Sequence, residues 1–188
     1  MTMLRIDFSF VAISLCTAAA AAGPVLAQDT FILTSPAIAD GGDLPADMKC
    51  SRDGGDGLSP PLAWSGMPEG TESLAVIMQH YPRGRVEGVD APSQYWLLWN
   101  IPPETTDLPR GNPASLGDEG ADKDGRFTGY TPPCSPAGAR HEYKITAYAL
   151  STPPETLPAS DSLSVDWTVM TQAIQDDVIA SSSFSFWN

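Results

Sequence analysis

The chain has 188 residues, of which 23 are acidic and 10 are basic, so its formal net charge is −13. A field of this sign repels nucleic acid and anionic membrane surfaces, and we expect partners of neither kind. With 18 prolines and 16 glycines, most of the chain is also excluded from helix.

The first 27 residues have the pattern of a cleaved secretory signal peptide. Arg5 gives a positive start, residues 8–22 are almost uninterruptedly apolar, and residues 25–27 place small side chains before a cleavage position at Gln28. The apolar run is short for a membrane span, so we expect no stable membrane insertion. Residues 28–188 should then form a single domain of a periplasmic or secreted protein, with an uncleaved anchor as the alternative.

Cys50 and Cys134 are the cysteines that follow this segment. An even number of cysteines in an oxidising compartment favours a disulfide, and two separate buried thiols are the alternative. A bond between them would close a loop of about 84 residues and would stabilise the fold by roughly 4 kcal/mol in the chain-entropy model.

Short runs of strand length, separated by Gly, Pro and Asp clusters, predict an all-β sandwich with one late helix. The helix is predicted over residues 165–180, with Ser164 as N-cap, because Val165, Val169, Ile174 and others fall on one helical face. A final strand follows it. The predicted strands span residues 31–33, 62–64, 73–78, 95–101, 143–150 and 183–187.

The run 95–101 carries aromatic side chains at alternating and at adjacent positions, which is typical of a strand buried on both faces. We expect Trp96 and Trp99 to be core residues. Tyr95 opens the strand, where a side chain can leave the core and reach a site, so both roles stay open for it.

A stretch from Gly129 to Tyr148 joins a proline-rich, cysteine-bearing loop to an alternating strand, and His141 stands where the two meet. Prolines remove much of the conformational freedom of such a loop before folding. Loops held on a rigid sheet often carry sites. The stretch is therefore either a structural corner or one wall of a binding site.

Several stretches together resemble the phosphatidylethanolamine-binding protein family, in its secreted bacterial Raf kinase inhibitor-like branch. They follow the family order and cover most of residues 31–150. The resemblance implies a Greek-key β-sandwich with a C-terminal helix, a short final strand and a small pocket at one end that binds phosphate-like anions. The matching stretches are residues 31–36, 58–64, 70–78, 95–102 and 129–134, with the pair His141 and Tyr143.

Carried over residue by residue, the resemblance places Pro133, His141 and Tyr143 in the pocket. The other wall departs from the family pattern. The leading aspartate of an Asp-Pro-Asp-Ala-Pro turn falls on His80, the end of that turn is displaced to residues 90–92 by an insertion, and a strand-opening histidine falls on Tyr95. The pocket is thus expected to be a variant, made of His80, Tyr95, Pro133, His141 and Tyr143.

These side chains offer ring N–H and hydroxyl donors that suit a small oxyanion, such as phosphate, a phosphomonoester or phospholipid head group, a sulfate or a carboxylate. Imidazole can be cationic near neutral pH, and charge-assisted hydrogen bonds are the stronger kind. Ligand affinity is therefore expected to rise as the pH falls from about 7.5 to 5.5.

Other functions are less well supported by the sequence. No serine or other nucleophile is marked out, and Gly-x-Ser-x-Gly, Walker-type and His-Glu-x-x-His motifs are absent, so we expect a binding protein rather than an ester hydrolase. A copper site using His80, Cys134 and His141 lacks an axial methionine at suitable spacing, and we expect no metal and no cofactor. A protein-interaction or protease-inhibitor role using the insertion at residues 80–92 is the main alternative. The sequence leaves the oligomeric state, monomer or homodimer, open.

Overall fold

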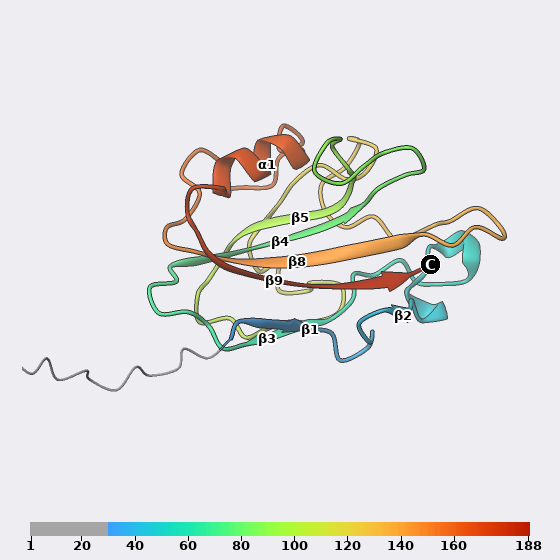
Figure 1. Ribbon diagram of the computed structural model, residues 1–188, viewed down its shortest axis with the longest axis horizontal. Helices are drawn as coiled ribbons and strands as arrows, with labels where there is room; N and C mark the ends of the chain where they lie inside the picture. Colours follow the sequence, from blue (N-terminus) through green and yellow to red (C-terminus); the bar gives the residue numbers. More distant parts are fainter. Residues whose placement is uncertain (1–29) are drawn as a thin grey trace, which may run out of the picture.

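Two facing sheets form the body of the protein in the computed structural model, which describes residues 30–188 (Figure 1). The predicted signal peptide lies outside the described residues. The smaller sheet has the strand order β1-β3-β6, and the larger has the order β2-β9-β8-β4-β5-β7. The all-β sandwich predicted from the sequence is confirmed.

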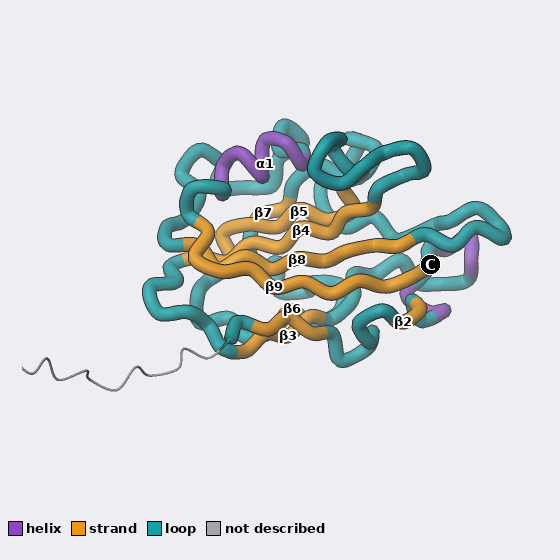
Figure 2. Tube along the Cα trace, viewed as in Figure 1, coloured by secondary structure: helices purple, strands orange, loops and turns teal. Residues whose placement is uncertain are grey.

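The strands of the smaller sheet are β1 (Ile32–Thr34), β3 (Leu62–Ser65) and β6 (Asp107–Leu108), paired antiparallel. In the larger sheet four long strands run antiparallel to their neighbours, and the two-residue strand β2 pairs parallel with β9 (Figure 2). The strands of the larger sheet are β2 (Gly42–Asp43), β4 (Ser73–His80), β5 (Ser93–Ile101), β7 (Asp118–Glu119), β8 (Glu142–Leu150) and β9 (Val178–Trp187).

Both faces of the larger sheet are covered, which explains its continuous apolar strands. Along β4, Leu74, Val76 and Met78 point into the core between the sheets. Ala75 and Ile77 point to the opposite face, which packs under an α-helix near the C-terminus. Each large aliphatic side chain buried in this way stabilises the fold by roughly 1.5–3 kcal/mol.

Strand β5 shows the two-sided burial most clearly. Trp96 faces the core between the sheets and Trp99 faces the helix, and neither side chain is exposed to solvent. Each indole N–H has a partner: that of Trp96 donates to Glu119 Oε1 at 2.9 Å, and that of Trp99 to the carbonyl of Pro158 at 2.9 Å. The core role predicted for both tryptophans is confirmed.

The helix is shorter than the sequence predicts. Helix α1 spans Trp167–Ile174, and its N-cap is Asp166, whose carboxylate accepts from the backbone N–H of Val169 at 2.9 Å. The predicted N-cap Ser164 is therefore wrong. The predicted extension to residue 180 is also wrong, because residues 178–180 pair with β8 and open β9.

Two features override the helical periodicity at this point. Pairing with β8 gives residues 178–180 a ladder of backbone hydrogen bonds, and Val178 and Ile179 are β-branched residues that fit a strand better than a helix. Val169, expected on the buried helical face, is 39% exposed, and the buried helical residues are Met170 and Ile174.

The short elements lie in segments where no hydrophobic periodicity predicts them. They are the two-residue strands β2, β6 and β7 and two 3-10 helices, Ala46–Met48 and Ser51–Asp53. Within residues 30–188 no helix is long and apolar enough to cross a membrane.

The capping assignment can be tested with a pair of variants. Asp166→Ala should lower the free energy of unfolding by about 1 kcal/mol, because the amide of Val169 loses its acceptor at the start of α1. Ser164→Ala should change it by less than about 0.5 kcal/mol, as expected for a surface substitution away from a cap. Urea denaturation followed by circular dichroism measures both, and a larger effect at Ser164 would contradict the assignment.

Candidate functional site

The antiparallel order of three neighbouring strands brings the predicted site residues together. Strand β4 lies between β8 and β5, so its C-terminal end meets the N-terminal ends of both. His80 is the last residue of β4, and Tyr95 lies near the start of β5. His141 directly precedes β8, and Tyr143 is the second residue of that strand. Residues far apart in sequence therefore meet at one end of the sandwich.

A β-bulge turns Tyr95 toward this end. Met78 pairs with Trp96, but the next residue, Gln79, pairs with Gln94, so Tyr95 has no opposite residue on β4. A bulge breaks the alternation of side chains along a strand. As a result the adjacent residues Tyr95 and Trp96 both belong to the core between the sheets.

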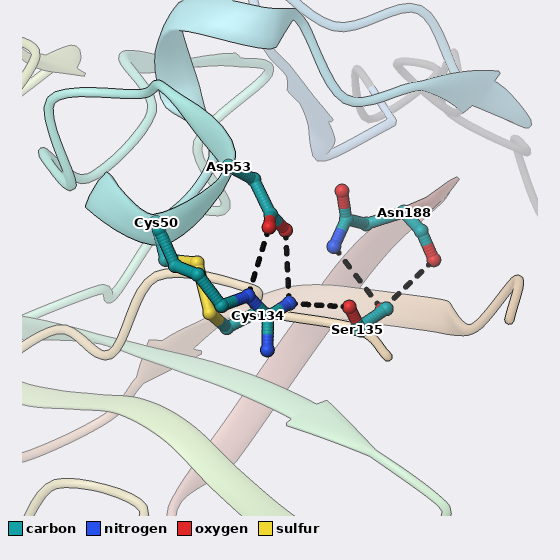
Figure 3. The surroundings of a disulfide bond; sticks show 6 residues. Cys50, Asp53, Cys134, Ser135 and Asn188 are labelled. Carbon is teal, nitrogen blue, oxygen red and sulfur yellow. Dashed lines mark hydrogen bonds and ion pairs between the residues drawn. A yellow bond between two sulfur atoms is a disulfide. The ribbon is translucent and has the colours of Figure 1, made fainter. Parts of the chain in front are cut away.

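The proline-rich loop is fastened to both sides of the site. The backbone N–H of Thr131 donates to the carbonyl of Tyr95 at 2.7 Å, and the N–H of Cys50 donates to the carbonyl of Pro133 at 3.1 Å. The predicted disulfide joins Cys50 to Cys134, with 5.3 Å between their Cα atoms (Figure 3). These contacts fix the loop against the start of β5 and against the second 3-10 helix.

Beyond the disulfide, the loop is held by the end of the chain. The hydroxyl of Ser135 donates to the carbonyl of Asn188 at 3.0 Å and accepts from its side-chain amide at 3.1 Å (Figure 3). The backbones of His141 and Asn188 exchange two hydrogen bonds, which extend the pairing of β8 with β9. The backbone of His141 is thereby fixed.

A chain of hydrogen bonds determines the tautomers of the two histidines. His80 Nδ1 lies 2.8 Å from the carbonyl oxygen of Glu142, which can only accept, so the proton is on His80 Nδ1. Burial lowers the pKa of His80 below its usual 6.5, which keeps the ring neutral and leaves its Nε2 as an acceptor. His141 Nδ1, 3.1 Å away, must then donate to His80 Nε2.

This arrangement leaves one ring nitrogen for a ligand. Both nitrogens of His80 are occupied, and His80 is only 8% exposed. Among residues 30–188, His141 Nε2 has no hydrogen-bond partner and is not a buried orphan atom. In neutral His141 this atom carries a lone pair, and in protonated His141 it carries a charge-assisted donor.

Two tyrosines stand beside the histidines. The rings of Tyr95 and Tyr143 meet edge to face with centroids 4.9 Å apart, and Tyr143 stacks on Phe186 at 5.6 Å. Burial, together with the neighbouring Tyr143 hydroxyl, raises the pKa of Tyr95 well above its usual value. Tyr95 therefore stays protonated at physiological pH and can act as a neutral donor.

A cavity of about 340 Å³ opens over this cluster. His80, Tyr95, His141 and Tyr143 all line it, whereas Pro133 is buried and does not. Pro133 acts through its carbonyl, which positions Cys50 and the disulfide. Four of the five predicted site residues thus converge on one cavity.

The cavity also includes residues that the sequence analysis did not single out. Lys123 is the most significant, because it is the only lysine or arginine in the lining. Its backbone N–H donates to Thr131 Oγ1 at 3.0 Å, which ties its loop to the proline-rich loop. In the sequence Lys123 stands among four nearby acids, Asp118, Glu119, Asp122 and Asp124, a context that resembles an ordinary solvated surface. The other added lining residues are Pro82, Ser93, Cys134, Ser135 and Pro136.

The groups in and around this cavity do not form a metal site of the copper type. The single cluster of three metal-ligand types found within residues 30–188 is Cys50, Asp53 and Cys134, and its two sulfurs are bonded to each other. A disulfide sulfur is not a thiolate ligand. His80, the second histidine of that hypothesis, uses both ring nitrogens in hydrogen bonds.

Comparison with protein families finds a match over residues 34–186, to the family described as phosphatidylethanolamine-binding protein. A relative from Methanothermobacter thermautotrophicus, a UPF0098 protein, is 36% identical over 131 residues, which cover 64% of this chain and 76% of the relative. The Escherichia coli UPF0098 protein YbcL is 33% identical over 147 residues, covering 71% of this chain and 75% of YbcL.

Solved structures show the same fold. A phosphatidylethanolamine-binding protein homologue from Chlamydia trachomatis superimposes with a TM-score of 0.71 at 27% identity, covering 85% of this chain and 97% of that one. The crystal structure of YbcL, described as a member of the mammalian phosphatidylethanolamine-binding protein family, gives a TM-score of 0.69 at 27% identity, covering 84% of this chain and 96% of YbcL.

The tautomer assignment can be tested by NMR. In long-range ¹H–¹⁵N spectra at pH 8, the neutral form of each histidine should carry its proton on Nδ1, because the carbonyl of Glu142 orders the whole chain of hydrogen bonds. His80 should protonate only below its usual pKa of 6.5. In His80→Phe, which removes the acceptor but keeps a ring, the proton of His141 should move to Nε2 in most molecules. An Nε2–H tautomer of His141 in the wild type would refute the assignment.

Proposed function

This chain belongs to the phosphatidylethanolamine-binding protein family, and on that premise we propose that it is a secreted, non-enzymatic protein that binds a small anion. The ligand class is phosphate, a phosphomonoester or phospholipid head group, or a carboxylate. The binding site is the cavity at the end of the sandwich, with His141 Nε2 as its central group.

The observation that carries this proposal is the single accessible ring nitrogen of His141. The ring of His141 is held by the hydrogen bonds that link it to His80 and Glu142, and the other donors of the cavity are the hydroxyls of Tyr95 and Tyr143 and the ammonium of Lys123. A preorganised set of donors binds an oxyanion without the cost of ordering the side chains. No carboxylate lines this cavity, so the repulsion expected from the overall charge of −13 is locally relieved. The ammonium of Lys123 meets Asp124 outside the lining at 3.1 Å, in an exposed and therefore weak ion pair that can yield to a ligand.

The same geometry supports binding rather than catalysis. Cys134 is oxidised, and the hydroxyl of Ser135 is engaged with Asn188 on both its donor and its acceptor side. Neither side chain is an activated nucleophile of the kind that acyl or phosphoryl transfer through a covalent intermediate requires. The disulfide also supports export to an oxidising compartment.

The proposal predicts a pH dependence of a definite sign. Calorimetry should show phosphoethanolamine binding about tenfold more tightly at pH 5.5 than at pH 7.5, because protonated His141 adds a charge-assisted donor worth roughly 1.5 kcal/mol. Phosphate itself gains a proton near pH 6, so the same comparison is made with sulfate, which keeps its charge. Sulfate should show the larger increase.

A variant separates the contribution of His141 from general effects of pH. His141→Gln should bind both anions weakly and with little pH dependence, since the amide cannot become cationic. Arg126→Gln removes an exposed cation that lines none of the cavities described here and should behave as the wild type. Equal affinity of the wild type for sulfate at the two pH values would refute the proposal.

A second function, protein interaction through the insertion, has one observation in its favour. The insertion carries two exposed apolar side chains, Val86 and Val89, with exposed fractions of 58% and 81%. Two hydrogen bonds within the insertion stabilise its turn. The guanidinium of Arg85 donates to the carbonyl of Ala91 at 2.6 Å, and the backbone N–H of Val86 donates to the carboxylate of Asp90 at 2.9 Å. A rigid loop with an apolar tip is suited to bind a protease or another extracellular protein.

The two functions can be distinguished with one double variant. Val86→Ser with Val89→Ser should leave sulfate binding unchanged, because neither side chain lines the cavity at His141. If a panel of secreted proteases is inhibited by the wild type, inhibition should fall at least about tenfold in the variant, as expected for hot-spot residues. Inhibition that survives the double variant would exclude the insertion as the contact.

A further inference from the structure

We propose that the anion site continues past His141 into a second subsite made by Arg83 and Arg140, and that the ligand is a small molecule with two anionic groups. This inference rests on the proposed anion-binding function and makes its ligand class more specific. It predicts a preference for bis-anions, such as bisphosphonates or bisphosphates, over molecules with one anionic group.

The second subsite is a depression of about 660 Å³ on the other side of His141. It shares His80 and His141 with the smaller cavity, so the two are contiguous at these side chains. The remaining lining residues come from the turn after β4, from the end of the proline-rich loop and from the first residue of β8. They are Tyr81, Arg83, Gly138, Ala139, Arg140 and Glu142.

The charges that line the two cavities run against the charge of the protein as a whole. Arg83 and Arg140 line the second subsite and Lys123 lines the first, and Glu142 is the single acid in either lining. Asp124, which lies outside both linings, pairs with Lys123 at 3.1 Å. The whole chain has more than twice as many acids as bases, 23 against 10. Cations gathered on both sides of one histidine, in so acidic a protein, favour a ligand with negative charge at both ends.

Arg140 is oriented with its donors available. Its guanidinium lies 4.7 Å from the ring centre of Trp187, a stacked position that engages the face of the group. The N–H donors lie at the edge, and one of them meets Asp43 at 2.9 Å. Both partners of that ion pair are mostly exposed, at 61% and 77%, so the pair is weak and can yield to a ligand.

Arg83 is placed by the insertion itself. It follows Pro82 directly after β4, and among residues 30–188 its side chain makes no salt bridge. The internal bonds of the turn, from Arg85 to Ala91 and from Val86 to Asp90, limit where the residue can lie. The insertion thus adds a cation whose charge no neighbouring carboxylate neutralises.

A ligand with two anionic groups would use both subsites at once. One group would lie in the cavity with Tyr95, Tyr143 and Lys123, and the other would lie between Arg83 and Arg140. Once the first group is bound, the second binds as an intramolecular event at high effective concentration. A zwitterion such as phosphoethanolamine would place its ammonium against the arginines and would lose this gain.

The test is calorimetry on the wild type at pH 7.5 with propylphosphonate and with alkane bisphosphonates whose two groups are separated by two to four methylenes. At least one bisphosphonate should bind tenfold or more tightly than propylphosphonate, the order expected for one added charge-assisted contact. In the double variant Arg83→Gln, Arg140→Gln the preference should fall below about threefold. The affinity for propylphosphonate should stay within about threefold of the wild type.

Controls separate the possible failures. Arg126→Gln removes one exposed cation elsewhere and should retain the preference, while Arg83→Gln alone, which disturbs no contact with Trp187, should lose part of it. Propylphosphonate binding without any preference, or a preference that persists in the double variant, overturns the second subsite and leaves the anion site standing. Failure of every phosphonate to bind the wild type overturns both.

Discussion

The hydrogen bond from His80 Nδ1 to the carbonyl of Glu142 decides the chemistry of the site, although neither group need touch a ligand. A backbone carbonyl can only accept, so it fixes the proton on one nitrogen of His80, and the depressed pKa of that ring leaves the other nitrogen bare. His141 must then donate to it. The carbonyl oxygen of Glu142, in the backbone of β8, therefore determines which ring nitrogen carries the proton in His80 and in His141.

This chain of hydrogen bonds depends on the strand order of the larger sheet. Because β4 runs antiparallel to β5 and β8, the last residue of one strand lies beside the first residues of two others. The bulge at Tyr95 then adds a hydroxyl that strict alternation would have turned to the other face. The disulfide holds the proline-rich loop, the remaining wall of the cavity, because it joins this loop to a segment 84 residues earlier in the sequence.

The sequence predicted the long strands of the sheet and named four residues that the structure brings together at one cavity, because both have strong local signatures. Apolar runs of strand length define β4, β5 and β8, and His141 and Tyr143 follow a loop that proline makes distinctive. The tautomers of the two histidines could not be predicted from the sequence, because they depend on contacts between strands. Lys123 could not be predicted as a lining residue either, because it reaches the cavity only when its loop folds back over β5. The end of α1 was mispredicted for a similar reason, since the pairing of residues 178–180 with β8 is a long-range contact.

An imidazole at position 80 has a consequence for the charge of the pocket. A carboxylate at this position would favour the protonated form of the neighbouring His141 by direct attraction. Neutral His80 offers only a lone pair, so the permanent positive charge of the site comes from Lys123, Arg83 and Arg140, and a protonated His141 adds to it. The bound anion then stabilises the very cation that holds it, and by linkage its binding draws in a proton.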